Sequence, residues 1–490
     1  ACVKLKSLLY IRTIYIMYSE IPSSYPATFF YNLQKLQGSL SKNLIKVTAD
    51  NVNASPSTIS NIRLPIGALL NIDSTALYFK VDILGTNVTI PARYASTFIK
   101  RMSLSINNTS VAIINDYNLL YNIYADCTNK DYTKGVGGEL LDNSIIWTEA
   151  AGSSDQTAIT GNSALLAATA KQTGMQFCIN NWIGILGSAS TRIWNTSSMG
   201  EVILSIEWCP NFEVLGGTAE GSSTTYTAAD TYSVSDIYLQ TEALSFSDDM
   251  YYNSVMDKDL KIGFNDYVVT RFAQVQKKNS INVSTYISAG SIDHVLGTAV
   301  LPQSVPKPMV AYGSLGTGAA EANVANRFKY LSDPVTYDSN ASSTASENIY
   351  GDGFYSTLAM QRCLQHLETS QFSINNKALN YAPLNKYEVF QNNLNALGYE
   401  GVDASSNGMH SGVVSLLHFY KYYGFCMQSL ELIDKDQFYI SGLSSAGSSC
   451  AINWVATFSG SSNTLAVVPV IVAKLSKVLH VGKGREISVE

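Results

Sequence analysis

Short apolar runs separated by turn residues dominate the chain from about residue 62 onward. The segment Met102–Asn107 alternates apolar and polar residues throughout, and Leu77–Ile83 alternates in its later part. A period of two places successive side chains on opposite faces of a strand. Two further segments, Val202–Trp208 and Ala451–Phe458, show the same pattern, and each contains a tryptophan. We therefore predict half-buried strands at these positions, and the two tryptophan segments are expected to be similar closing strands.

Two segments have the periodicity of helices instead. Tyr355–Thr369 carries apolar residues at helical spacing. Leu384–Leu397 begins with Asn385, a residue type that favours the N-cap, and is followed by Gly398 as a stop signal. We expect both to form short helices in loops between strands.

Two internal segments of low complexity interrupt the strand pattern. Gly216–Asp230 and Asp338–Ser346 are rich in Gly, Ser, Thr and Ala, and the first is predicted to be a linker or exposed loop between two halves. Each half would open with a strand, Asn61–Ile83 in the first and Ser233–Phe246 in the second. Many short strands without a fixed repeat period favour two β-sandwiches over a propeller.

The composition points to a subunit whose surface is partly covered by neighbours. Charged residues make up 14% of the chain, against roughly 25% in an average soluble domain, while 30 tyrosines supply polarity without charge. The net charge of -6 argues against a protein that mainly neutralises nucleic-acid phosphates, although a local basic patch remains open.

The cysteines and the apolar runs indicate the environment of the chain. The cysteines form no C-x-x-C pair and are odd in number, so we expect free, mostly buried thiols in a reducing compartment. Arg12 interrupts the apolar run near the N-terminus, which argues against a signal peptide. The run Leu465–Ala473 is too short for a membrane span. The seven cysteines are Cys2, Cys127, Cys178, Cys209, Cys363, Cys426 and Cys450.

Three segments of the sequence partly match catalytic or nucleotide-binding motifs, but their residue spacing or composition does not fit. Gly442–Gly447 does not have the spacing of a nucleophile elbow, Gly313–Gly318 is not a dinucleotide fingerprint, and His480–Arg485 lacks parts of a phosphate loop. The acids Asp248, Asp249, Asp257 and Asp259 are expected in solvated turns rather than as a glycosidase pair. We predict no catalytic, cofactor-binding or metal-binding residue and no enzymatic activity. The scattered histidines are His294, His366, His410, His418 and His480.

Several segments resemble, in their order along the chain, the landmarks of double jelly-roll major capsid proteins from polinton-like viruses, virophages and their relatives. The resemblance extends from about residue 60 to residue 490, and each motif is short and hydrophobic. In the first half the segments are Ile62–Pro65, Leu69–Ile72, Leu77–Phe79, Phe98–Leu104, Asn115–Leu120, Trp182–Gly187 and Met199–Ile206. In the second half they are Val234–Thr241, Val283–Ser288, Ser291–Val295, Ser441–Leu443, Trp454 and Val478–Gly482.

The resemblance implies an all-β fold of two consecutive eight-stranded jelly-roll sandwiches, with short helices in loops. The expected divisions are an N-terminal arm over 1–45, a first jelly roll over 46–220, a linker over 221–232 and a second jelly roll over 233–490. The implied function is that of a viral major capsid protein, which forms pseudo-hexameric trimers and builds an icosahedral capsid around the genome. It implies a location in the virion, contacts with neighbouring capsomers and with penton and minor capsid proteins, no sequence-specific nucleic acid and no transmembrane segment.

Two other functions compete with this interpretation. A carbohydrate-binding β-sandwich, such as a lectin or a receptor-binding fibre, fits the content of Tyr and Trp through stacking on sugars. A glycoside-active enzyme would need two carboxylates that face each other across a groove.

Overall fold

The computed structural model describes most of the predicted strands, and all that follows concerns its larger compact unit, residues 42–244 and 256–490. The strands pair in antiparallel fashion throughout the described residues. The described residues are 40–84, 88–89, 95–128, 147–149, 156–158, 175–214, 216–217, 231–246, 260–276, 280–288, 290–300, 364, 366–396, 424–431, 442–445, 450–459, 466–482 and 484–490.

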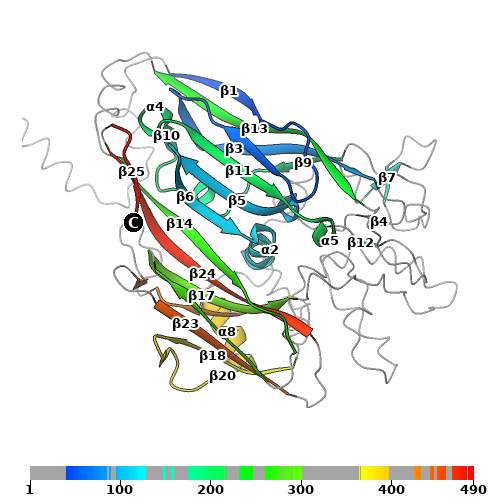
Figure 1. Ribbon diagram of the computed structural model, residues 1–490, viewed down its shortest axis with the longest axis vertical. Helices are drawn as coiled ribbons and strands as arrows, with labels where there is room; N and C mark the ends of the chain where they lie inside the picture. Colours follow the sequence, from blue (N-terminus) through cyan, green and yellow to red (C-terminus); the bar gives the residue numbers. More distant parts are fainter. Residues whose placement is uncertain are drawn as a thin grey trace, which may run out of the picture. The chain divides into compact units, whose positions relative to one another are not determined.

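The first sandwich consists of two sheets, which we name sheet A and sheet B (Figure 1). In Figure 1 the green strand β13 lies between the blue strands β1 and β3, although β13 comes far later in the sequence. Sheet A contains, in order, β1 (Leu40–Thr48), β13 (Tyr232–Phe246), β3 (Leu69–Ile83) and β10 (Ile193–Asn195), with β9 (Met175–Ile179) also on β3. Sheet B contains β2 (Ile59–Arg63), β11 (Val202–Trp208), β5 (Ile99–Ile106) and β6 (Thr109–Asn115).

The second sandwich consists of sheet C and sheet D. Sheet C contains, in order, β14 (Leu260–Arg271), β24 (Ala466–Val481), β17 (Ser291–Val300) and β21 (Cys426–Ser429), with β15 (Val275–Gln276), β22 (Leu443–Ser444) and β25 (Ile487–Val489) at its margins. Sheet D contains β16 (Ser280–Ile287), β23 (Cys450–Phe458), β18 (Leu367–Ile374) and β19 (Lys377–Ala378), with β20 (Leu384–Asn385) on β18.

Short helices and two small strand pairs complete the described elements. The strand pairs are β12 (Gly216–Gly217) with β4 (Val88–Thr89), and β7 (Trp147–Glu149) with β8 (Gln156–Ala158). The helices are η2 (Ala95–Phe98), α2 (Tyr117–Thr128), α3 (Ile185–Ser188), α4 (Thr196–Met199), α5 (Asn211–Val214) and α8 (Lys386–Ala396).

Both sandwiches have the same strand order. If the main strands of each sandwich are numbered 1 to 8 along the chain, with β9 and β10 sharing position 6, one sheet reads 1-8-3-6 and the other 2-7-4-5. Sheets A and C share the first order, and sheets B and D share the second. This is the order of a jelly roll, in which the last strand returns to pair beside the first.

The hydrophobic cores of the two sandwiches also share one feature, a buried tryptophan at the same strand position. Trp208 in β11 and Trp454 in β23 occupy strand 7 of their sandwiches, and both are fully buried. The indole Nε1 of Trp208 donates to Ser60 Oγ at 2.9 Å, and that of Trp454 donates to Ser370 Oγ at 3.0 Å. Each indole therefore satisfies its polar atom inside an apolar core, as a buried tryptophan requires.

The predicted strands are confirmed, but the expected closing strands are each followed by one more strand. β11 and β23 are equivalent, as predicted, and their side chains alternate between buried and half-buried. However, β13 follows β11 and β24 follows β23, and in both sandwiches this last strand pairs with the first.

The strand that was expected to open the second jelly roll belongs to the first. Val234–Thr241 lies within β13, where Tyr238 faces Tyr78 of β3, so the expected boundary at residue 233 falls inside the first sandwich. The physical reason is that β13 completes sheet A by pairing with β1 and β3. Likewise, β1 begins at Leu40, inside the segment expected to be an arm. The predicted linker lies outside the described residues except for Thr231 and Tyr232.

One of the two predicted helices is confirmed. Asn385 Oδ1 accepts from the backbone N–H groups of Tyr387 and Glu388 at 3.0 Å each, and Glu388 Oε2 accepts from Asn385 N at 2.8 Å. This reciprocal capping box starts α8 at Lys386. The helix predicted over Tyr355–Thr369 is wrong at its end, because Leu367–Thr369 belongs to β18 and pairs with β23. Most of its remainder lies outside the described residues.

We expect Gly297→Ala to destabilise the second sandwich. A Cβ at Gly297 would lie 2.4 Å from Cδ2 of Trp454, so the indole or β17 must shift. Overpacking of this kind costs about 1–3 kcal/mol, and chemical denaturation of the purified chain would measure it. The matched control is Gly263→Ala in β14, where the nearest atom to the new Cβ is Ser190 Oγ at 3.7 Å. Equal losses in the two variants would contradict the packing argument.

Candidate functional site

No described cluster of side chains has the arrangement of an active centre. No group of three His, Cys, Asp or Glu side chains in the described residues could hold a metal ion. Among the helices described, none is long and apolar enough to cross a membrane. Of the motifs considered in the sequence, Ser444 lies in β22, and His480 in β24 contacts Glu490 at 3.3 Å. Gly313–Gly318 and the four acids of the glycosidase alternative lie outside the described residues.

The four cysteines that the structure describes are buried thiols and form no disulfide, as predicted. They are Cys178, Cys209, Cys426 and Cys450. Burial raises the pKa of the Cys426 thiol to about 12, so this thiol stays protonated and unreactive at neutral pH.

The two sandwiches meet at a surface that we name the sandwich junction, where β6 and α3 contact β14. Ser188 Oγ accepts from Asn265 N at 2.8 Å, and Ser190 Oγ accepts from Gly263 N at 2.9 Å. In return, Ser190 N donates to Gly263 O at 2.8 Å. The backbone groups on the free edge of β14 therefore form hydrogen bonds with the loop around α3, where a further strand would otherwise pair.

A cluster of four charged side chains lies in the junction. Arg271 Nε in β14 donates to Asp116 Oδ2 at 2.7 Å, and Lys100 Nζ lies 2.6 Å from Asp116 Oδ1. Lys100 also contacts Oε1 of Glu213, whose side chain is fully buried and whose Oε2 accepts from Asn118 Nδ2 at 2.7 Å. Two cations face two carboxylates, so the cluster is neutral as a whole. Buried charges are tolerated only when they are paired in this way.

The backbone around Asp116 positions this cluster. Asp116 lies between β6 and α2 with a φ of 50°, in the left-handed region that Asp tolerates better than most residues. Its carbonyl accepts from Leu120 N at 3.0 Å and so begins α2. One turn further, the ring of Tyr124 meets Tyr267 of β14 edge to face at 5.5 Å. Burial raises the pKa of Tyr267, which stays a neutral phenol in this contact.

A second charged group lies on sheet C. Asp293 Oδ2 accepts from Ser476 Oγ at 2.6 Å and lies 3.8 Å from Lys474 Nζ. Burial raises the pKa of Asp293 to about 6, although Ser476 and Lys474 oppose the shift. Burial also lowers the pKa of the neighbouring His294 to about 3, so this imidazole is neutral near pH 7. Asp293 is buried and shares Lys474 with Glu431, so these two carboxylates do not form a glycosidase pair across a groove.

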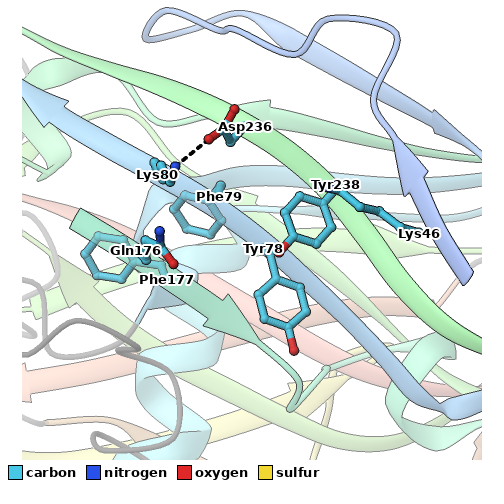
Figure 2. A pocket seen from close by; sticks show the side chains of 8 residues that line it. All are labelled: Lys46, Tyr78, Phe79, Lys80, Gln176, Phe177, Asp236 and Tyr238. Atoms are coloured by element: carbon cyan, nitrogen blue, oxygen red, sulfur yellow. Dashed lines mark ion pairs between the residues drawn. The ribbon is translucent and has the colours of Figure 1, made fainter. Parts of the chain in front are cut away.

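A pocket of about 210 Å³ opens on the outer face of sheet A between two rows of side chains (Figure 2). In the first row the rings of Tyr78 and Tyr238 stack at 5.1 Å, and Lys46 Nζ lies 3.6 Å from the centre of the Tyr238 ring. In the second row Lys80 Nζ contacts Asp236 at 2.6 Å. Tyr238 lies between Tyr78 and Lys46, so its ring faces are not open for stacking on a sugar.

A β-bulge creates this pocket. The pairing of β13 with β3 passes from Ser235↔Lys80 to Tyr238↔Tyr78, so that Asp236 and Ile237 together oppose one residue, Phe79. Asp236 has a φ of 51°, and its hydrogen bond with Lys80 lowers its pKa. The extra residue separates the two rows.

Sequence reasoning missed the junction cluster and the pocket. Lys100 and Asp116 lie in two of the segments that resemble capsid-protein landmarks, but nothing in the sequence brings them together with Glu213 and Arg271. For the pocket, the sequence indicated only that Tyr78 and Tyr238 lie in strands, and it gave no sign that the two rings stack.

We expect Asp293→Asn to change how stability depends on pH. The folded pKa of Asp293 is about 6, above the ordinary value near 3.9, so the folded state binds more protons than the unfolded state between these values. The charge on Asp293 therefore lowers stability as pH rises through this window. The parent chain should therefore lose stability from pH 4 to pH 7, and the variant should not. We expect the difference in unfolding free energy, variant minus parent, to increase by about 1–2 kcal/mol between these two pH values. Urea denaturation at each pH gives the unfolding free energies of both proteins. If their difference is the same at every pH, the prediction is refuted.

Comparison with known proteins bears on the fold. No family model and no curated protein sequence matches this chain. Among solved structures, the crystal structure of PBCV-1 VP54 fitted into a reconstruction of the virophage Sputnik is similar, with a TM-score of 0.57 and 10% identity. A quasi-atomic model of the PBCV-1 virus capsid has a TM-score of 0.59 and 11% identity. Each covers 94% of this chain and 99% of the other. The chain therefore has a double jelly-roll fold, as predicted from its sequence.

Proposed function

We propose that this chain is a viral major capsid protein, a structural subunit that forms pseudo-hexameric trimers and assembles into an icosahedral capsid around the genome. The observation that carries the proposal is the repetition of one jelly roll within one chain, in sandwiches joined through a neutral buried cluster. The similarity to PBCV-1 capsid structures over 94% of the chain supports it.

The geometry suits a shell subunit for a physical reason. A jelly roll ends in strands whose edges need cover, and side-by-side packing supplies that cover. Three chains with two sandwiches each give a ring of six similar units, which tiles a surface with local sixfold packing. The low content of charged residues, 14%, agrees with large interfaces between subunits, where charged residues are depleted.

Several finer points belong to the same proposal. The order of short motifs along the sequence favours the lineage of polinton-like viruses and virophages. The protein would reside in the virion and contact neighbouring capsomers, penton proteins and minor capsid proteins. It would have no enzymatic activity and no sequence-specific contact with nucleic acid. Within the chain, we propose that the boundary between the two jelly rolls falls in residues 247–259, between β13 and β14.

Light scattering coupled to size exclusion, with electron microscopy of the same fraction, tests the proposal. We expect a species with roughly three times the chain mass of 53.2 kDa, pseudo-hexagonal outlines, or closed shells. A stable monomer that never assembles and that binds glycans on an array would overturn the proposal in favour of the carbohydrate-binding alternative.

The junction should be needed for this assembly. Arg271→Ala leaves Asp116 and Glu213 with one cation, Lys100, in a site that is largely closed to water. Removing one partner of a buried ion pair costs about 3–5 kcal/mol, and the partial exposure of Arg271 places the expected loss at about 2–3 kcal/mol. We expect a lower denaturation midpoint and fewer trimers. The control is Arg63→Ala, whose partners Asp50 and Glu201 are exposed to solvent. Similar losses in both variants would contradict this role.

A further inference from the structure

The pocket on the outer face of sheet A is bordered by polar groups that the chain itself leaves unpaired (Figure 2). Among the described residues, no carboxylate forms an ion pair with the exposed amine of Lys46. In the same part of the chain, the side-chain amide of Gln176 and the hydroxyl of Tyr238 form no hydrogen bond with a protein group. Three polar groups from β1, β9 and β13 thus border one hollow, as in a site for a small polar ligand.

We infer that this pocket binds one hexuronic acid unit, a six-carbon sugar that carries a carboxylate, within an acidic polysaccharide. In this assignment the amine of Lys46 binds the carboxylate, while Gln176 and the hydroxyl of Tyr238 bind hydroxyl groups of the sugar. We name these three residues the uronate site. This binding activity goes beyond the proposed structural role, because it gives the subunit a ligand outside the shell.

The charges of the pocket favour a ligand with one negative group. Lys80 is already compensated, because its amine contacts Asp236 at 2.6 Å. Asp236 and, more weakly, Asp82 raise the pKa of Lys80, which keeps its charge in this pair. Of the two cations that line the pocket, Lys46 is therefore the one without an acid beside it. Its amine lies 3.6 Å from the centre of the Tyr238 ring, a cation–π contact that positions it at the pocket.

The other groups of the lining favour hydroxyls around that carboxylate. Gln176 offers both a donor and an acceptor, and the hydroxyl of Tyr238 can act as either. Asp236 adds carboxylate oxygens, which accept hydrogen bonds from hydroxyls and repel a further anion. A sulfate ion presents only acceptors and would leave the acceptors of Gln176 and Asp236 unused. A hydroxylated ring with a single carboxylate matches both kinds of group.

The size of the pocket fits one sugar unit. Its volume of about 210 Å³ is that of about seven water molecules at their share of the liquid. Sites that enclose drug-sized ligands measure roughly 300–1,000 Å³, so this pocket takes one unit and not a longer segment. Stacking has no part in the binding, because Tyr78 and Lys46 cover the two faces of the Tyr238 ring. The sugar is held through its polar groups alone.

A single uronate site is weak, and repetition makes it effective. One exposed ion pair and a few hydrogen bonds correspond to a dissociation constant on the order of 1 mM for the monosaccharide. A particle that repeats the site gains about 10²–10⁴ in avidity on a polymer that reaches several copies. This gain rests on the proposed function, whereas binding of the monosaccharide does not.

Saturation-transfer NMR of the full-length chain tests the site with sodium galacturonate and sodium glucuronate as probes. Galactose and glucose are the neutral counterparts, and acetate is the bare carboxylate. We expect saturation transfer to at least one uronate, and binding at least fivefold weaker for the neutral sugars and for acetate. Transfer to neither uronate, or equal binding of a neutral sugar or of acetate, overturns the inference.

A charge substitution assigns the binding to this pocket. Lys46→Gln removes the cation from an exposed strand position and keeps a long polar side chain, so the fold is preserved. We expect about fivefold weaker binding of the uronate. The matched control is Lys42→Gln, because Lys42 lies on the same strand and the same face but does not line the pocket. Unchanged binding in Lys46→Gln, or equal weakening in both variants, contradicts the assignment.

A neutral substitution separates a sugar site from a site for bare anions. Gln176→Met keeps the length of the side chain but removes its donor and acceptor. It should weaken binding of the uronate about fivefold and leave the much weaker binding of acetate unchanged. Full binding of the uronate by this variant shows that the pocket does not contact the sugar hydroxyls through Gln176, and it overturns the inference.

The state of assembly keeps this inference distinct from the proposed function. Light scattering of the same samples reports whether the chain forms trimers or shells. A chain that assembles and binds no uronate overturns the uronate site and leaves the capsid function standing. A chain that binds a uronate through Lys46 and Gln176 but never assembles supports the site and overturns the capsid function.

Discussion

The ion pair between Arg271 and Asp116 is the interaction on which the arrangement of the two sandwiches depends. It connects β14 of the second sandwich to the turn that starts α2 of the first, and it completes a neutral cluster with Lys100 and Glu213. A charge in this position cannot rotate away into water without leaving its partner buried and unpaired. Combined with the serine cover of the β14 edge, it specifies one relative orientation rather than a loose apolar contact.

Each sandwich also solves its internal packing in the same way. A tryptophan on strand 7 fills the centre and gives its indole hydrogen to a serine hydroxyl, Ser60 in one case and Ser370 in the other. In the second sandwich Gly297 makes room for the indole. The two halves thus share strand order and core design, although loops and helices of different length connect their strands.

The sequence predicted the strands where alternation was clear, as in Val202–Trp208 and Ala451–Phe458, because period-two patterning reflects a sheet with one buried face. The cap of α8 was also predictable, because Asn385 and Glu388 act within one helical turn. Strand partners were not. β13 has the pattern of an opening strand, and only its pairing with β1 and β3 reveals that it closes the first sandwich. The junction cluster escaped for the same reason: its four residues come together only when distant segments pack.

The return of the last strand to the first has a consequence for how the chain is made. β1 finds its partner β13 only after nearly half of the polypeptide has been synthesised, and β14 waits in the same way for β24. Because sheets A and C share one strand order, β1 and β14 could each pair with the wrong closing strand. Synthesis from the N-terminus offers β13 to β1 before any residue of β24 exists, and domains generally fold in that order. Because β13 precedes β14 in the sequence, β1 can pair with β13 before β24 is made. The order of synthesis thus separates two strand pairings that the strand order of the sheets alone would not distinguish.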